Sequence, residues 1–314
     1  MKKEKVLSET LESYRGKKTY QEVITEGINA FAGKREVPPD ISQETDITKK
    51  LLFFIFINEV IASSEKYANI RTFVPALIGK TGVGKTSAIN KVAEILNLPI
   101  KTLLLQTMLP EEVTGIPFAQ KEKTYYPLPA WIPDDAIEDT LSPTHNLTVK
   151  KPQPLTFREG TFILFLDELD TARQEVLAAV LTLLAEKKIR DTRLFVVPLV
   201  AMRPVAEEWQ EGETAEALIS CLNFLYFPVE IGYEFIAKKY KIGNFAETEV
   251  QKVNEQEIIP ALNFLPPSVF EYAIAFIDNC MQFGILKKDI RELTKGFLTD
   301  VHFNAVWRFI QNKN

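Results

Sequence analysis

A glycine-rich segment of eight residues constrains this chain more than any other feature. Residues 79–86, GKTGVGKT, match every fixed position of the pattern G-x-x-x-x-G-K-[ST]. The glycines let the backbone curl so that consecutive N–H groups face inward. Lys85 adds a positive charge toward the β and γ phosphates, and the Thr86 hydroxyl can ligate magnesium. The segment therefore indicates a site for the phosphates of ATP or GTP.

The residues on both sides of this loop agree with that interpretation. Residues 72–78 form a short apolar, β-branched run, and residues 87–96 carry apolar side chains at helical spacing. A strand, a loop and a helix in this order aim the positive end of the helix dipole at a bound phosphate. Pro75 fits less well, because it removes a backbone donor from the predicted strand.

A second segment, residues 161–168 (TFILFLDE), is a continuous apolar run that ends in two carboxylates. A run that is apolar on both faces is typical of a central parallel strand. At its carboxyl end, Asp167 is placed to hold a magnesium ion and Glu168 to polarise an attacking water. An apolar strand that merely ends in acidic turn residues is the alternative, and the intact phosphate loop upstream favours nucleotide hydrolysis.

Composition places the chain among ordinary globular proteins. Its 314 residues are 46% hydrophobic and 25% charged, which suffices for two domains. The net charge of −5 and the absence of a sustained basic block argue against nucleic acid as a partner class. The longest apolar stretch, within residues 51–62, is too short for a bilayer, and the N-terminal residues do not resemble a secretion signal. We therefore expect a cytoplasmic protein with no membrane contact. Cysteine and histidine are too few and too scattered for a metal cluster.

Strand and helix patterns alternate along the chain. Strands are expected at residues 72–78, 100–105, 161–166, 194–201 and 222–229, and helices at 46–66, 87–96, 171–184 and 268–279. Asp170 is placed to cap the third of these helices. The order predicts an α/β fold of the P-loop NTPase kind, a parallel sheet sandwiched by helices, with a C-terminal helical lid domain. We expect an N-terminal extension at 1–45, the nucleotide-binding core at 46–230 and the lid at 231–314, with a proline-rich, irregular span at 110–160.

Several segments, in this order, resemble the AAA+ ATPases and, within them, the MoxR-like and dynein-related branch. After the phosphate loop, residues 109–117 (LPEEVTGIP) are similar to that branch's "p-x-D-L-x-G-x-P" segment. Residues 128–131 (LPAW) and 165–170 (FLDELD) follow, the latter similar to the signature "fLDELN". The resemblance covers roughly residues 45 to 280.

The resemblance implies ATP and Mg²⁺ as cofactors, with the purine between core and lid and hydrolysis moving the lid against the core. It implies a homo-oligomeric, hexameric ring that remodels or matures a protein, often with a von Willebrand factor A domain partner. Catalytic roles are expected for Glu168, Lys85 and Arg203, and metal binding for Thr86 and Asp167. The residues expected to contact the nucleotide are Gly79, Lys80, Thr81, Gly82, Val83, Gly84, Lys85, Thr86 and Ser87.

Three positions depart from the family pattern. Arg203 stands where a polar sensor, usually Asn, is expected; Asn223 aligns with the arginine finger; and Pro267 aligns with the lid's sensor arginine. Arg190 and Arg193, like Arg203, could instead serve a neighbouring subunit or form surface salt bridges. In the proline-rich span, the aromatic residues Tyr125, Tyr126 and Trp131 could contact a partner or pack locally.

Two other functions stay open because of these departures. A degenerate subunit could bind ATP as a structural or regulatory clamp with little or no turnover. A nucleic-acid-associated motor would instead show DNA-stimulated turnover that falls steeply with salt. ATP rather than GTP rests on the resemblance, since no N-K-x-D segment that reads guanine is evident.

Overall fold

A five-stranded parallel sheet forms the centre of the protein. The computed structural model describes residues 16–31, 41, 44–64, 66–67, 70–121, 123–137, 157–204, 213–227 and 267–313. The sheet has the order β2-β5-β8-β1-β9, and every neighbouring pair is parallel. Its strands are β1 (Val74–Ile78), β2 (Ile100–Leu104), β5 (Phe162–Asp167), β8 (Val196–Met202) and β9 (Leu222–Tyr226). The predicted α/β fold with a parallel sheet is confirmed.

The apolar character of β5 on both faces follows from its place inside the sheet. Phe162, Leu164 and Leu166 belong to the hydrophobic cluster on one face, and Ile163 and Phe165 belong to the cluster on the other. Successive side chains of a strand point to opposite faces, so a strand covered on both sides needs apolar residues throughout.

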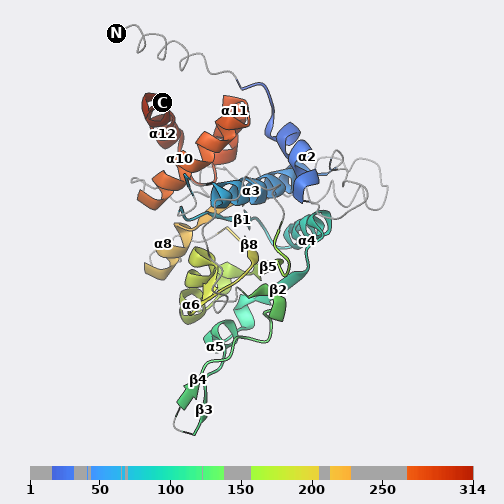
Figure 1. The fold of residues 1–314 in the computed structure, drawn as a ribbon, viewed down its shortest axis with the longest axis vertical. Coiled ribbons are helices and arrows are strands. Elements are labelled where there is room, and N and C mark those ends of the chain that lie inside the picture. The colour runs from blue at the N-terminus through green and yellow to red at the C-terminus, as the bar shows by residue number, and fades with distance from the viewer. Residues whose placement is uncertain are drawn as a thin grey trace, which may run out of the picture.

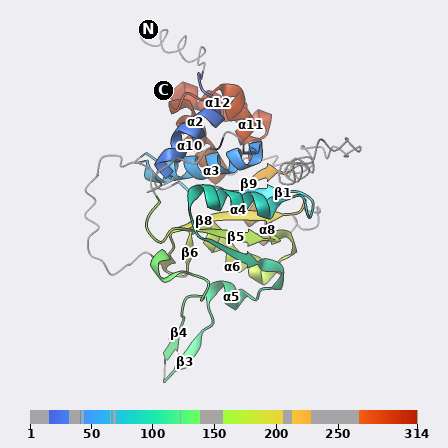
Figure 2. The ribbon, with the colours of Figure 1, turned by 90° about the vertical axis from the view of Figure 1, so that its right-hand side faces the viewer.

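Helices cover both faces of the sheet, as Figure 2 shows. On one side lie α3 (Asp46–Ser63) and α4 (Lys85–Leu96), and on the other lie α6 (Gln174–Glu186) and α8 (Glu213–Ile219). This is the sandwich that the alternating pattern predicted. Within the described residues, no helix combines the length and apolarity that crossing a bilayer requires.

A further layer of helices packs on the outer side of α3 (Figure 1). It contains α2 (Tyr20–Phe31), α10 (Pro267–Gln282), α11 (Lys287–Thr294) and α12 (Asp300–Lys313). Because α3 lies between the sheet and this layer, residues 51–57 are all buried. The rings of Phe54 in α3 and Phe276 in α10 stack with centroids 5.4 Å apart. Much of the proposed extension and of the proposed lid, residues 1–15, 32–40 and 231–266, lies outside the described residues.

Buried polar groups join α3, the start of β1 and α10, and we call this set the α3–α10 junction. Asn58 Nδ2 donates to the Phe73 carbonyl at 2.8 Å, and the Tyr272 hydroxyl donates to Asn58 Oδ1 at 2.8 Å. The rings of Phe73 and Tyr272 stack with centroids 4.3 Å apart. Asn58 is one of two polar residues, with Glu59, in the long apolar stretch, and both ends of its amide have a hydrogen-bond partner inside the core.

The span that was expected to be irregular contains short elements. After β2 come η1 (Leu105–Thr107), α5 (Pro110–Thr114), the antiparallel pair β3 (Phe118–Gln120) and β4 (Lys123–Tyr125), and η2 (Asp134–Ala136). The β3–β4 hairpin projects from the body at the end opposite the C-terminal helices (Figures 1 and 2). A second small hairpin, β6 (Lys188–Ile189) and β7 (Thr192–Arg193), follows α6.

Two local expectations need correction. Asp170 does not cap a helix: it belongs to η3 (Leu169–Thr171), and α6 begins at Gln174 after an N-cap residue, Arg173, whose side chain makes no capping bond. Pro75 does not disturb β1, although β1 has neighbours on both sides. Pairing with β9 includes Pro75, whereas the register with β8 begins one residue later, at Ala76.

Candidate functional site

Three neighbouring strands end at the same edge of the sheet and bring the predicted site segments together. In the parallel register, Ile78 of β1 lies opposite Met202 of β8, and Ala201 of β8 lies opposite Asp167 of β5. The phosphate loop, the acidic pair and the segment after β8 therefore leave the sheet side by side. The carboxyl ends of parallel strands are where α/β proteins bind ligands.

These segments enclose a cavity of about 320 Å³, which we call the loop cavity. Its lining comprises Thr81, Gly82, Gly84, Lys85, Thr86, Ser87, Asp167, Glu168, Asp170, Met202 and Arg203. All the residues predicted to act in catalysis or metal binding are in this set. Of the predicted nucleotide-binding residues, Gly79, Lys80 and Val83 are not among the lining residues. Val83 instead packs in the core.

The backbone of the loop explains its glycines. Gly82 and Gly84 have φ of 80° and 104°, in the region that side chains disfavour. A Cβ on Gly79 would lie 2.6 Å from the Phe227 carbonyl oxygen, so that position must stay small. Gly84 is also the N-cap of α4 and has no side chain to bond the first N–H groups of the helix. Those N–H groups can bind an anion.

Lys85 is held inside the loop by main-chain oxygens. Its Nζ donates to the Gly79 carbonyl at 2.7 Å and to the Lys80 carbonyl at 2.8 Å. Partial burial lowers the pKa of Lys85, while the charges of Asp167 and Asp170 oppose that shift. Gly79 and Lys80 thus position the ammonium rather than line the cavity.

Asp167 lies between opposing influences at the end of β5. Partial burial raises the pKa of Asp167, and the neighbouring Glu168 charge raises it further. The Glu168 N–H, which donates to Asp167 Oδ1 at 3.0 Å, the Lys85 ammonium and the Thr86 hydroxyl limit the rise. The carboxylate and the Thr86 hydroxyl line the same cavity, so two hard oxygen ligands face one space.

Glu168 has a strained backbone, which the sequence did not reveal. Its φ of 58° is left-handed, a conformation that costs a non-glycine residue roughly 1–2 kcal/mol. Thr171 holds it there, because its N–H and its hydroxyl donate to the Glu168 carbonyl at 3.1 and 2.9 Å. Such strain persists only where the surrounding structure enforces it, and it gathers at functional sites.

The Arg203–Asp170 pair was also missed. Arg203 Nε donates to Asp170 Oδ2 at 2.7 Å, and the Arg203 N–H donates to Asp170 Oδ1 at 3.0 Å. The Asp170 side chain is 7% exposed and that of Arg203 is 52% exposed. Asp170 therefore orients Arg203 along the wall of its own chain's cavity. In the sequence, Asp170 follows β5 and Arg203 follows β8. These positions indicate a pair only once β5 and β8 are known to be neighbours in the sheet.

The other residues singled out from the sequence lie elsewhere. Asn223 is fully buried in β9, so the position aligned with the arginine finger does not face a neighbouring subunit. Pro267 is the first residue of α10. Trp131 is buried against Phe162, and its Nε1 donates to the Glu112 carbonyl at 3.1 Å, which is the local packing alternative.

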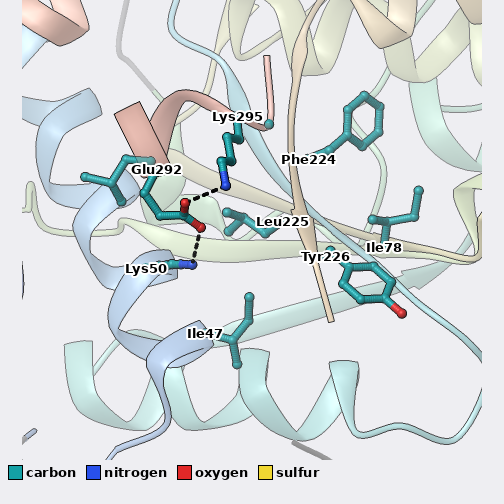
Figure 3. Close-up of a pocket in the computed structure, with 10 residues that line it drawn as sticks. Ile47, Lys50, Ile78, Phe224, Leu225, Tyr226, Glu292 and Lys295 are labelled. Carbon is teal, nitrogen blue, oxygen red and sulfur yellow. Dashed lines mark ion pairs between the residues drawn. The ribbon is translucent and has the colours of Figure 1, made fainter. Parts of the chain in front are cut away.

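A second cavity, of about 90 Å³, lies between the sheet and the C-terminal helices (Figure 3). Ile47, Ile78 and Tyr226 line it from the core, and Leu293 and Gly296 line it from α11 and the residues after it. Lys50, Glu292 and Lys295 line it as well, and Glu292 pairs with Lys50 at 3.7 Å and with Lys295 at 2.8 Å. Its lining is part apolar and part charged, and Ile78 in that lining directly precedes the phosphate loop.

The comparisons with known proteins concern the same segment. Residues 76–207 match the model of the AAA domain of the dynein-related subfamily, and this range includes the phosphate loop, the acidic strand end and Arg203. No curated protein matches the sequence of this chain. Among solved structures, a full-length MCM homolog from Methanopyrus kandleri is similar, with 9% sequence identity and a TM-score of 0.44. The match covers 94% of this chain and 61% of that chain, so this chain spans less than two thirds of its length.

Proposed function

We propose that this chain, an AAA+ protein by its residues 76–207, binds ATP with Mg²⁺ and hydrolyses it. The observation that carries the proposal is the loop cavity, where Lys85 and Thr86 from one segment and Asp167 and Glu168 from another converge. A cation for phosphates, two oxygen ligands for a metal and a carboxylate for water are the parts that phosphoryl transfer to water requires.

The residues present fit Mg²⁺ and a triphosphate. Magnesium prefers hard oxygen ligands and keeps several waters, so one hydroxyl and one carboxylate from the protein suffice beside phosphate oxygens. Thr86 and Asp167 supply these two ligands. A Cβ built on Gly82 would meet nothing within 4 Å, so the loop is open on the side where phosphates would lie. A bound magnesium ion would neutralise charge on the phosphates during transfer.

Each catalytic side chain has a defined task in this proposal. Lys85 exchanges its two carbonyl partners for phosphate oxygens. Glu168 orients the attacking water and accepts its proton, aided by a backbone that is already fixed. Arg203 acts within its own chain, since its guanidinium lines the same cavity and is oriented by Asp170. In that position it would stabilise charge on the γ-phosphate in place of the expected amide.

We place the purine in the second cavity, between the core and the C-terminal helices. The apolar side chains in its lining suit the flat face of a base, and the lining includes Ile78, the residue before the loop. Adenine rather than guanine remains part of the proposal through the family resemblance. Changes at the Lys50–Glu292 pair would then link nucleotide state to the position of α11.

The wider role that we propose is that of a MoxR-like member: a cytoplasmic homo-oligomeric ring, hexameric by resemblance, that remodels or matures a protein partner. A von Willebrand factor A domain protein is the partner class to test first. Two observations support this role: the sequence segments that resemble the branch occur in its order, and residues 76–207 match the AAA domain model.

Phosphate release by the purified protein tests the activity. Wild type is compared with Glu168→Gln and Lys85→Ala in the presence of ATP and Mg²⁺, over a range of protein concentrations so that a ring can assemble. We expect Glu168→Gln to bind a fluorescent ATP analogue but to release phosphate roughly 10² to 10⁴ times more slowly. Lys85→Ala should lose binding. If wild type releases no more phosphate than Glu168→Gln with candidate partners present, ATP hydrolysis by this chain is ruled out.

A nucleotide-dependent clamp is the second candidate, and Arg203 is the observation that favours it. Among the described residues that line the cavity, Arg203 is the one arginine, and it is paired with Asp170. If Arg203→Ala leaves slow phosphate release unchanged and binding intact, Arg203 is a structural residue and the clamp is preferred. If release falls, Arg203 participates in turnover. Turnover stimulated by DNA and abolished by moderate salt would instead support a nucleic-acid motor.

A further inference from the structure

The projecting hairpin exposes apolar side chains that a free loop would normally avoid. We call residues 116–126, which contain β3 and β4, the arm. Ile116, Phe118, Tyr125 and Tyr126 are between 44% and 65% exposed. The rings of Phe118 and Tyr125 stack on each other with centroids 5.4 Å apart. The arm therefore has an ordered apolar surface far from the loop cavity.

The two ends of the arm meet at its base. Gly115, the residue before the arm, has a φ of 93°, and a Cβ placed on it would lie 2.1 Å from the carbonyl oxygen of Pro127, the residue after the arm. Only glycine allows the two chain segments to approach this closely. The base is therefore a narrow neck through which the arm connects to the body.

A single guanidinium bridges this neck. Arg190 donates from one terminal nitrogen to the Tyr126 carbonyl at 3.1 Å and from the other to the Gly115 carbonyl at 3.0 Å. Its Cζ also lies 4.6 Å from the centroid of the Tyr126 ring. A planar fork that bonds two acceptors and covers an aromatic ring is a task for arginine, and lysine cannot reproduce it.

The backbone of Arg190 is strained in a way that favours glycine. Arg190 and Asp191 form the two-residue turn between β6 and β7, where Ile189 pairs with Thr192. Arg190 has a φ of 53°, and the first position of such a turn is normally glycine when φ is positive. The arginine is thus placed in a costly conformation, where its side chain reaches the neck of the arm.

The turn that carries Arg190 is connected to the loop cavity through one helix. Glu168 and Asp170 line the cavity, and α6 starts a few residues later and leads directly into β6. Along its length α6 also packs against α5, the helix that ends at the neck. A shift of the segment around Glu168 can therefore reach both sides of the neck through packed elements.

We propose that Arg190 is a positioning residue that couples nucleotide occupancy of the loop cavity to the order of the arm. The inference rests on the proposed function, since it needs a nucleotide at the cavity. With nucleotide bound, α6 holds Arg190 against Gly115 and Tyr126, and the arm is rigid. When the nucleotide is lost the hold loosens, and the apolar surface changes its presentation to a protein partner.

Hydrogen exchange on the full chain tests this coupling. Wild type, Arg190→Ala, Arg190→Lys and Arg190→Gly are measured with and without a slowly hydrolysed ATP analogue and Mg²⁺. In wild type the analogue should slow exchange in both the phosphate loop and the arm. In Arg190→Ala and Arg190→Gly the loop should still be protected, while the arm should exchange roughly tenfold faster and no longer respond, as expected for losing a charge-assisted hydrogen bond. Lysine should restore the charge but not the response.

Lys188→Ala is the matched control, because it removes a cation from the same hairpin whose partner is Glu186 rather than the arm. It should behave as wild type. An arm that responds equally in wild type and Arg190→Ala overturns the inference, as does a wild-type arm that ignores the analogue while the loop is protected. If the analogue does not slow exchange in the wild-type phosphate loop, the proposed function is overturned, and the inference with it. That result is read in the phosphate loop, whereas failure of the coupling alone is read in the arm.

Discussion

The loop cavity and the α3–α10 junction both contain buried or half-buried polar groups. The groups at the junction are satisfied by hydrogen bonds, whereas the charged groups at the cavity are disfavoured by their surroundings. At the junction, the Tyr272 hydroxyl donates to Asn58, and Asn58 donates to the main chain inside the core. At the cavity, burial lowers the pKa of Lys85 and raises that of Asp167, so both charged forms are disfavoured by their surroundings. Glu168 adds a left-handed backbone.

The difference indicates which region supports the fold and which performs chemistry. Satisfied polar groups in a core stabilise one packing arrangement. Charges held in costly positions lower stability, and a ligand with opposite charges can offset that cost. Substitutions at the cavity should therefore alter turnover and hardly reduce stability, and substitutions at the junction should do the reverse.

The largest expected effect is at Glu168. Glu168→Gly removes the carboxylate and places glycine where φ is positive. We expect phosphate release to fall roughly 10² to 10⁴-fold. The free energy of unfolding should stay unchanged or rise by up to about 1 kcal/mol, because strain is relieved while glycine adds chain entropy to the unfolded state. Steady-state turnover and chemical denaturation measure the two quantities. A clear loss of stability would show that Glu168 also supports the fold.

The next effect is at the junction. Tyr272→Phe keeps the stacked ring but leaves the buried Asn58 Oδ1 without its donor, which should lower the free energy of unfolding by about 1–3 kcal/mol. Turnover should not change. Tyr125→Phe, which removes a hydroxyl from the exposed arm, is the control and should not alter stability. Combining Tyr272→Phe with Asn58→Ala should cost less than the sum of the two single losses, because both changes remove the same Tyr272–Asn58 hydrogen bond; strictly additive losses would mean that this bond does not carry the effect.

A smaller effect is expected for Asp170→Asn. The amide oxygen can still accept from the Arg203 N–H, but the charge that holds the guanidinium is lost. We expect turnover to fall by roughly twofold to tenfold and stability to change by less than about 1 kcal/mol, since Arg203 is half exposed. The same two assays apply. If nucleotide binding is lost while turnover of the bound nucleotide is unchanged, the Arg203–Asp170 pair contributes to binding ATP and not to the chemical step.

Much of the fold was predictable because it depends on local patterns. The glycine spacing of the loop, the two-sided apolar run of β5 and the helical spacing of α4 are each determined within a few residues, and all three elements formed where expected. The convergence of Lys85 and Asp167 could also be anticipated, because carboxyl ends of parallel strands share an edge.

Other features depend on neighbours that are distant in sequence. The spacing of Asp170 to the next helix predicts a helix cap, but its carboxylate accepts from Arg203, which lies close only because β8 is next to β5. Arg190 reaches Gly115 and Tyr126 across more than sixty residues. Periodicity carries no information on such pairs. The left-handed Glu168 is likewise imposed by Thr171 and the strand end rather than by residue type.

The smallest expected effect concerns pH at the helix layer that includes the junction. Asp46 at the start of α3 accepts from the Tyr20 hydroxyl and from Gln21, and pairs with Lys50 at 3.2 Å, which ties α2 to α3. Partial burial raises the pKa of Asp46, but the bond from Tyr20 and the charge of Lys50 outweigh it and leave the pKa below its ordinary value. A carboxyl whose pKa is lowered on folding contributes stability above its unfolded pKa of about 3.9 and loses it as pH falls through the folded value.

Thermal unfolding of wild type and Asp46→Asn across the acidic range should therefore give a difference in stability that is constant near neutral pH and disappears as the pH falls through the lowered pKa of Asp46 in the folded state. Tyr20→Phe should reduce the same difference, since it removes the hydroxyl donor to Asp46. The effect should be modest because the Asp46 side chain is 49% exposed. The cavity carboxylate Asp167 has the opposite shift, so its protonation on acidification should not destabilise the fold in this way. A difference that grows as pH falls would mean that the Asp46 carboxylate opposes the packing of α2 on α3 instead of supporting it.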